Sequence, residues 1–227
     1  MQFDIVFISY NEPNADANYS ALRVRFPYAK RLHGVQGIHN AHKQAAKMSF
    51  TEKFWVVDGD SQIEETFNFK APKDLRDDAV YVYRARNAVN DLVYGYGGIK
   101  LLPKQGTMNV DTDATDMTTS ISENFFLVDE IASVTCFNSD AFSAWRSAFR
   151  ECVKLSSQVI DRQNYQETAD RLNAWLTYYP NKPFAQEVAE GAVAGKEYGR
   201  ANADNAEALK LINDFNWLQN KFMKTNS

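Results

Sequence analysis

The chain has 227 residues, and its 44% hydrophobic and 13% aromatic content is typical of a globular protein rather than a disordered or fibrous one. It has no apolar run of about 18 residues and no signal-peptide pattern. Its two cysteines, Cys136 and Cys152, are too few for a disulfide framework or a zinc site, so we expect a cytoplasmic protein. The net charge of −4 argues against a polyanionic partner for the chain as a whole.

The first part of the chain alternates strand-like and helical patterns, which predicts an α/β fold with a mostly parallel central sheet. A first strand is expected at FDIVFISY (3–10), before the turn residues Asn11, Glu12 and Pro13. A helix at 38–50 precedes a second strand, FWVV (54–57), and further strands are expected at 79–85 and 124–137. We therefore expect an α/β core over residues 1–138.

Residues 139–227 predict a helical C-terminal part packed on that core. Helices are expected at 141–155, 168–179, 183–200 and 205–222, with Ser139 or Asp140 capping the first of them. Glycine recurs every fourth residue at 191, 195 and 199, which favours close packing of one helix against another backbone. The alternative is a phosphate-binding loop, which would require these glycines to lie at the start of a helix.

The strongest local signal is FWVVDGDSQI, in which an apolar strand ends at Asp58-Gly59-Asp60. Alternate strand residues point the same way, so both carboxylates can reach one ion at the end of a parallel sheet, where α/β proteins bind ligands. Oxygen ligands of this kind suit Mg2+ or Mn2+. The alternative is an ordinary turn, because Asp and Gly are common turn residues.

Three elements in this order resemble glycosyltransferases of the GT-A fold, especially family-2-like members: Tyr10-Asn11-Glu12, the helix IHNAHKQAA, and the Asp-x-Asp at 58–60. The resemblance implies a nucleotide-sugar-binding core. Tyr10, Asn11 and Glu12 would hold the nucleoside of a UDP-sugar, and Asp58 and Asp60 would hold Mn2+ or Mg2+ on its diphosphate. Lys30 and Arg31 would assist at the phosphates.

The segment VYGYGGIKLLP (93–103) resembles the aromatic and glycine-rich acceptor loop of several such enzymes. It would supply the acceptor-binding residues Tyr94, Tyr96, Gly97 and Gly98. Where some families continue with acidic residues, this chain has Ile99 and Lys100, so the loop does not identify a catalytic base. A plain Gly-rich turn is the alternative.

The catalytic base is sought among other acids. Asp129 and Glu130, at the end of a predicted strand, are the preferred pair. Alternatives are three aspartates of a polar stretch, Asp111, Asp113 and Asp116, and Asp140, which is also a candidate helix cap.

Arg146 and Arg150 lie one helical turn apart and could both face a phosphate or carboxylate of the acceptor. Pairing with Glu151 at the surface is an equally good explanation.

The combination of motifs also resembles compact glycosyltransferases of T4-like bacteriophages, which are implicated in adding sugars, including arabinose, to 5-hydroxymethylcytosine in phage DNA. A stretch from 17 to 57 has an excess of basic residues that could meet DNA phosphates or form an ordinary solvated face: Arg23, Arg25, Lys30, Arg31, Lys43, Lys47 and Lys53. DNA as acceptor in a host cytoplasm is therefore one expectation. The alternatives are a glycan or small-molecule acceptor and a non-catalytic binding protein of the same fold.

Overall fold

The structure is a computed structural model that describes residues 2–94, 98–111, 117–136, 138–158 and 164–225. The chain forms two compact units, which are described separately. The first comprises residues 1–87 and 93–136, and the second comprises residues 88–92 and 137–227.

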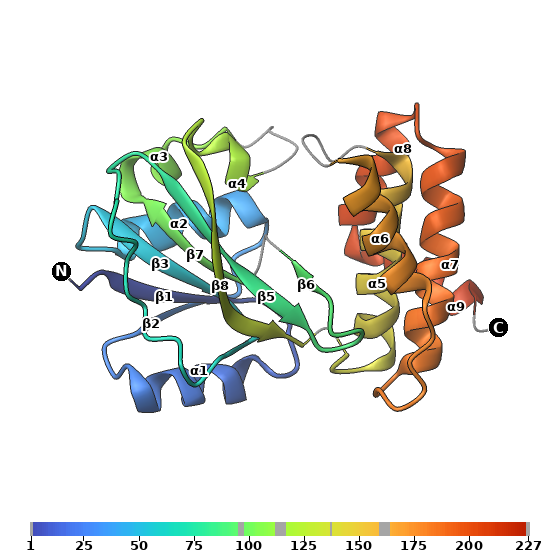
Figure 1. Cartoon of the computed structure of the whole chain (residues 1–227), viewed down its shortest axis with the longest axis horizontal. Coiled ribbons are helices and arrows are strands. Elements are labelled where there is room, and N and C mark those ends of the chain that lie inside the picture. Colours follow the sequence, from blue (N-terminus) through green and yellow to red (C-terminus); the bar gives the residue numbers. More distant parts are fainter. Residues whose placement is uncertain (1, 95–97, 112–116, 137, 159–163, 226–227) are drawn as a thin grey trace. The chain divides into compact units, whose positions relative to one another are not determined.

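An eight-stranded sheet forms the centre of the first unit (Figure 1). Its strands are β1 (Asp4–Ser9), β2 (Lys30–His33), β3 (Lys53–Asp58), β4 (Ser61–Ile63), β5 (Val80–Asn87), β6 (Val93–Tyr94), β7 (Ile99–Pro103) and β8 (Phe125–Thr135). The helices are α1 (Ala15–Arg25), α2 (Ile38–Met48), α3 (Lys104–Met108) and α4 (Met117–Ser120). The strand order is β2-β1-β3-β7-β5-β8-β4, with β6 paired to β5.

The sheet is mixed, so the expectation of a mostly parallel sheet was wrong. β1 runs parallel to β2 and β3, and β5 runs parallel to β8, but β7 is antiparallel to both of its neighbours and β4 is antiparallel to β8. Parallel neighbours require a long crossover, usually a helix, whereas only residues 88–98 connect β5 to β7. The chain therefore returns in the opposite direction.

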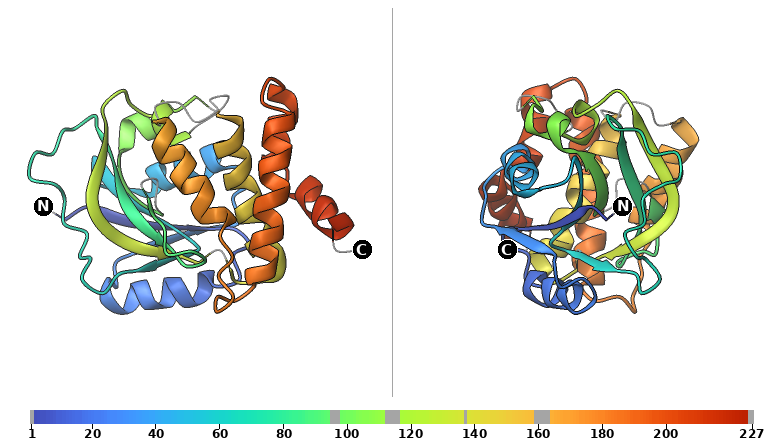
Figure 2. Two further views of the ribbon diagram at one scale, coloured as in Figure 1. Left: turned by 45° about the vertical axis from the view of Figure 1, so that its right-hand side comes forward. Right: turned by 90° about the vertical axis from the view of Figure 1, so that its left-hand side faces the viewer.

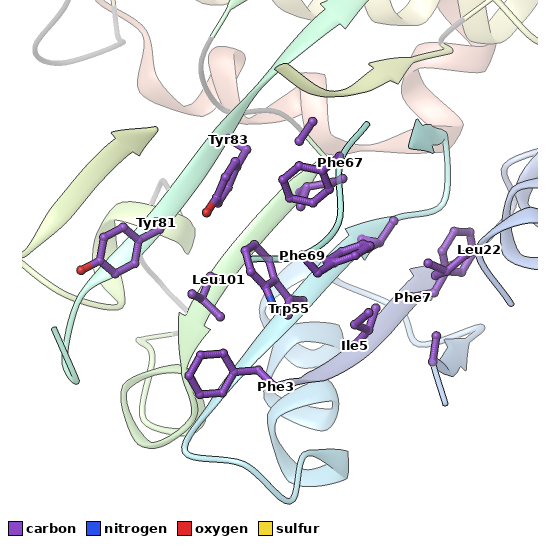
Figure 3. Packing of buried hydrophobic residues seen from close by; sticks show 14 of the residues in the cluster. Phe3, Ile5, Phe7, Leu22, Trp55, Phe67, Phe69, Tyr81, Tyr83 and Leu101 are labelled. Carbon is purple, nitrogen blue, oxygen red and sulfur yellow. The ribbon is translucent and has the colours of Figure 1, made fainter. Parts of the chain in front are cut away.

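The core of this unit lies on both faces of the sheet. On the α1 face, Trp55 packs edge-on against Phe67 and Phe69, with ring centroids 5.8 and 5.3 Å away, and contacts Tyr83 at 5.3 Å (Figure 3). On the other face, α2 contributes alanines to a second cluster with Phe54 and other residues of the sheet. Because side chains alternate along β3, Asp58 continues the α2 face.

Most elements expected from sequence are confirmed, including the strands at β1, β3, β5 and β8 and the helix α2. Seven elements of this unit were not expected: the helices α1, α3 and α4 and the strands β2, β4, β6 and β7. α1 has little amphipathic patterning and buries only Ala15, Asn18 and Leu22. β7 lies in the segment interpreted as an acceptor loop, and its five residues are all buried in the middle of the sheet.

The second unit consists of helices: α5 (Ala141–Ser157), α6 (Tyr165–Leu176), α7 (Ala185–Ala201), α8 (Ala206–Lys210), the 3-10 turn η1 (Leu211–Asn213) and α9 (Phe215–Thr225). Asp140 caps α5, because its carboxylate accepts the Ser143 backbone N–H at 2.8 Å, as expected. The single helix expected at 205–222 is instead broken at η1.

The glycine stripe of α7 is explained by packing, as expected. A Cβ at Gly191, Gly195 or Gly199 would collide with backbone atoms of α5, so the two helices run side by side at close range (Figure 2). These glycines lie within α7 and not in a loop at a helix start, which rules out the phosphate-loop alternative.

Two further features of the sequence, the lack of a long apolar run and the two cysteines, can be compared with the structure. Within the residues described, no helix is long and apolar enough to cross a membrane. Cys136 and Cys152 are both free. Burial raises the pKa of the Cys136 thiol to about 11, with a contribution from the charge of Asp60, so this thiol stays protonated at neutral pH.

Candidate functional site

The carboxyl ends of β1 and β3 bring the first two sequence motifs together. The two strands are parallel neighbours with Ile8 opposite Asp58, so the residues that follow them lie side by side. The Glu12 carboxylate accepts the Tyr10 backbone N–H at 2.7 Å and lies directly over Gly59. A Cβ at Gly59 would be only 2.8 Å from Glu12 Oε2 and 3.1 Å from Ser9 Cβ, so the glycine allows the Glu12 carboxylate to approach the turn closely.

Backbone contacts from separate elements fix the position of this turn. Asn18 of α1, which is 7% exposed, donates from Nδ2 to the Gly59 carbonyl at 2.9 Å. The Asp58 N–H donates to the Gly98 carbonyl at 2.8 Å, and the Cys136 N–H donates to the Asp60 carbonyl at 2.9 Å. The acidic turn is therefore held by α1, by the start of β7 and by the end of β8. Tyr10 and Asn11, beside it, are exposed.

A buried lysine is paired with the first acid of the motif. Lys100 Nζ of β7 donates to Asp58 Oδ2 at 2.8 Å, and the side chains are 7% and 38% exposed, respectively. The pairing follows from strand register, because Lys100 lies opposite Val56 and shares its face with Asp58. Lys100 was not predicted as a site residue, although a lysine inside the apolar run IKLLP is unusual and could have indicated a buried ion pair.

The charges at this turn are imperfectly balanced. Burial and the charges of Asp58 and Glu12 raise the pKa of Asp60 from 3.8 to about 7, and Lys100 offsets this only partly. Burial, together with the Lys100 charge, lowers the pKa of His42 to about 4, so this imidazole is neutral at pH 7. Among the described residues, the negative charges of Asp58 and Glu12 around Asp60 thus outweigh the one ammonium, Lys100, that offsets them.

These residues fit a divalent cation. Among the residues described, no three His, Cys, Asp or Glu side chains are grouped so as to hold a metal by themselves. Asp58 and Asp60 alone would leave most coordination positions open, which suits Mg2+ or Mn2+ shared with substrate phosphates. The donor set favours this fit: Asp58 and Asp60 flank Gly59, the Glu12 carboxylate lies against that glycine, and an added cation would relieve the repulsion between the acids.

The structure also places part of the expected acceptor segment. Gly98 lies against Ser61 and Asp58, since an added Cβ would overlap Ser61 Oγ and lie 3.4 Å from Asp58 Cβ. Tyr94 is in β6, opposite Ala85, and is partly buried. Tyr96 and Gly97 lie outside the described residues.

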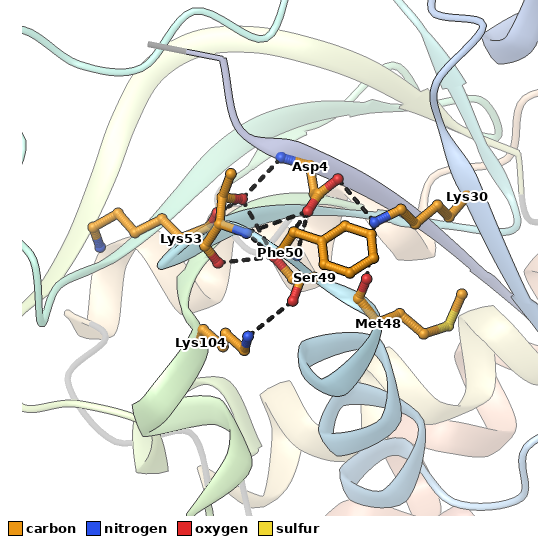
Figure 4. Close-up of polar contacts among 8 residues, drawn as sticks. Asp4, Lys30, Met48, Ser49, Phe50, Lys53 and Lys104 are labelled. Carbon is orange, nitrogen blue, oxygen red and sulfur yellow. Dashed lines mark hydrogen bonds and ion pairs between the residues drawn. The ribbon is translucent and has the colours of Figure 1, made fainter.

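The two basic residues expected at the phosphates lie on β2, where neighbours point to opposite faces. Arg31 bonds Ser9 Oγ at 2.9 Å and Asp16 at 2.7 Å, close to the end of β1. Lys30 instead pairs with Asp4 at 2.9 Å and donates to the Met48 carbonyl, near the N-terminal end of β3 (Figure 4). Lys30 is therefore at the opposite end of β3 from Asp58.

The basic residues of 17–57 do not form one surface. Arg25 donates to three backbone carbonyls at residues 64–67, and Arg23 lies beside the Tyr19 ring. Lys53 is buried and donates to the Ala79 carbonyl at 2.7 Å. Lys43 is partly buried, whereas Lys47 is exposed.

The acids proposed as catalytic bases lie elsewhere. Asp129 and Glu130 are exposed residues in the middle of β8 rather than at its end, and Asp129 pairs with Arg84 at 2.8 Å. Roughly 17 to 20 Å of strand separates them from Thr135, which is next to Cys136 and the acidic turn. Asp111 is exposed, and Asp113 and Asp116 fall outside the described residues.

The two arginines of α5 pack within the second unit. Arg146 lies over the rings of Phe142 and Phe215, at 5.6 and 5.3 Å from the ring centroids. Arg150 donates to Asn213 Oδ1 at 2.9 Å, and burial, with the Arg146 charge, lowers its pKa to about 10. Both arginines thus contact the C-terminal helical region of their own unit.

Comparisons with known proteins give only remote matches. No protein-family model matches the chain, and no curated protein matches it significantly. Among solved structures, the bifunctional IspDF from Campylobacter jejuni is similar over 56% of this chain, with 10% identity and a TM-score of 0.40. The chain spans about half (49%) of the length of IspDF. TarS 1-349 from S. aureus is similar over 98% of this chain and 88% of its own, with 10% identity and a TM-score of 0.36. Likeness at these TM-scores carries no information on function.

Proposed function

We propose that the protein is a metal-dependent glycosyltransferase that uses a nucleotide sugar, with UDP as the nucleotide. The observation that supports it best is the acidic turn itself: Glu12, Asp58 and Asp60 meet at the carboxyl ends of two parallel strands, next to exposed Tyr10 and Asn11. Ligands of α/β sheets bind at this edge. The order of motifs that resembles GT-A enzymes in the sequence is consistent with this placement.

In this proposal each residue of the turn has a defined task. Asp58 and Asp60 hold a divalent cation, which when bound neutralises charge developing on the nucleoside diphosphate leaving group. Tyr10 and Asn11 contact the nucleoside. Glu12 accepts the Tyr10 backbone N–H and packs against Gly59, which positions the nucleoside-binding segment next to the metal ligands. The acidic turn, anchored on three elements, stays fixed while the acceptor hydroxyl attacks the anomeric carbon.

Binding is the direct test of the donor site. Isothermal titration of UDP should show binding that requires Mn2+, and Asp58→Ala or Asp60→Ala should abolish it with little change in far-ultraviolet circular dichroism. Asp77→Ala, an exposed acid of the same unit, is the matched control and should bind as the wild type does. Unchanged UDP binding in EDTA, or in both site variants, would disprove the metal-dependent proposal.

The acceptor needs a separate assay. The sequence resemblance favours 5-hydroxymethylcytosine in DNA, and a glycan or small molecule is the alternative. Incubation with Mn2+ and a panel of UDP-sugars, with and without hydroxymethylated DNA, followed by mass spectrometry of the nucleosides, should reveal a hexose or pentose adduct. Donor hydrolysis without any adduct would favour the alternative acceptors. Asp129→Asn and Glu130→Gln in the same assay test whether these mid-strand acids take part in transfer: loss of adduct with donor binding retained would support a role as base.

A further inference from the structure

Lys100 has an incomplete set of hydrogen bonds for a buried ammonium. Its side chain is 7% exposed, and Asp58 Oδ2 is its one hydrogen-bond acceptor among the described residues. An ammonium carries three N–H donors, and buried donors are normally satisfied. The neighbouring imidazole of His42 is neutral and uses Nδ1 to donate to the Ile38 carbonyl at 2.8 Å. Lys100 thus retains donor capacity beside the acidic turn.

Lys53 is a second buried lysine of the same sheet and can be compared with Lys100. It is 2% exposed, donates to the Ala79 carbonyl at 2.7 Å and lies over the Tyr81 ring at 5.4 Å. Within the described part of the chain, its contacts are a neutral carbonyl and an aromatic face, with no carboxylate in hydrogen-bonding contact. Lys100, by contrast, contacts a 38% exposed carboxylate of the proposed metal site.

A divalent cation and the Lys100 ammonium would compete for Asp58. Both are positive, and each is attracted by the same carboxylate, so they repel each other when both contact it. The lysine ammonium is a compact charge on a flexible four-carbon stem, which allows it to move to a new anion nearby. The diphosphate of a donor, held by the metal next to Asp58, is such an anion.

We propose that Lys100 is a phosphate-binding residue of the donor site: it neutralises Asp58 while the metal is absent, and it contacts the nucleoside diphosphate when Asp58 holds the metal. This inference rests on the proposed function. It predicts opposite effects of Lys100 on two affinities, since Lys100 opposes metal binding alone and supports binding of the nucleotide.

The test is Lys100→Met, which keeps an unbranched side chain only one atom shorter and removes its charge. Mn2+ affinity without nucleotide, measured by electron paramagnetic resonance, should rise severalfold. UDP affinity at saturating Mn2+ should fall by about tenfold or more, because a charge-assisted hydrogen bond is lost. Lys53→Met, the matched buried control, should change neither affinity.

Several outcomes would overturn the inference. If Lys100→Met weakens both affinities, Lys100 only positions Asp58; if it changes neither or strengthens both, Lys100 does not bind the diphosphate. Should Lys100→Met fail to fold, Lys100→Arg keeps the charge and should retain wild-type UDP affinity, and a tenfold loss there without a structural change counts against the proposal. A wild-type protein that binds neither Mn2+ nor UDP would instead refute the proposed function itself.

Discussion

An aspartate–lysine pair lies near each end of β3, Asp4 with Lys30 at one end and Asp58 with Lys100 at the other, but the two carboxylates are bonded very differently. At the N-terminal end, Asp4 pairs with Lys30 and accepts hydrogen bonds from the backbone N–H groups of Phe50 and Thr51 and from Ser49 Oγ (Figure 4). At the C-terminal end, Asp58 accepts a side-chain bond from Lys100, and Asp60 lies near two further acids.

The pKa shifts of the two ends have opposite signs. Burial would raise the pKa of Asp4, but Lys30 and the backbone N–H groups outweigh burial and hold it below 3.8. For Asp60, burial and the charges of Asp58 and Glu12 act together, and the pKa rises to about 7. The Asp4 carboxylate is thus stabilised by its own hydrogen-bond partners and acts as a structural anchor. The acids around Asp60 are not fully compensated, and a bound ligand can supply the positive charge.

The largest expected effect is a loss of stability when the anchoring carboxylate, Asp4, is removed. Asp4→Ala should lower the free energy of unfolding by about 2 to 3 kcal/mol, because it leaves Lys30 and several backbone donors without their acceptor. Urea denaturation measures this loss. Asp16→Ala, which breaks a pair in which the aspartate is 90% exposed, is the control and should cost much less. Equal losses in both variants would show that the Asp4 cluster is not an anchor.

A second substitution tests the packing of the acidic turn. Gly98→Ala would force its Cβ onto Ser61, whose own Cβ would lie 2.9 Å away, so Ser61 or the Gly98 backbone that binds the Asp58 N–H must shift. We expect UDP affinity in Mn2+ to fall by about tenfold, since small displacements of site residues are costly. The double variant Gly98→Ala, Ser61→Gly removes the obstacle and should recover most of the affinity. A double variant as weak as the single one would contradict this steric cause.

The smallest expected effect is a pH dependence of stability. Asp60 has a folded pKa of about 7, above its unfolded value of 3.8, so its favourable contribution is complete below pH 3.8 and is lost as pH rises through 7. Asp60→Asn, neutral at every pH, should therefore melt about 2 to 4 °C higher than the wild type at pH 8. At pH 4 the two melting temperatures should nearly coincide. A difference that does not vary with pH would show that Asp60 is not repelled by its neighbours.

The local patterns of the sequence located the acidic motif but not the group that balances it. FWVVDGD predicts a strand that ends at two acids, and Asp140 before AFSAWR predicts a helix cap, because each is decided by residues adjacent in the chain. Lys100 could not be assigned in this way. Its partner is 42 residues away, and only the register of β7 against β3 places the two together.

By itself, then, the sequence determined the α/β character, the strands β1, β3, β5 and β8, the longer helices other than α1, and the turn that carries Asp58 and Asp60. The tertiary structure decided the direction of β7, the separation of Lys30 from Asp58, and the mid-strand position of Asp129 and Glu130. The physical reason is that hydrophobic periodicity reports whether a segment is buried on one side. It contains no information on which distant strand lies beside that segment, in which direction or in which register.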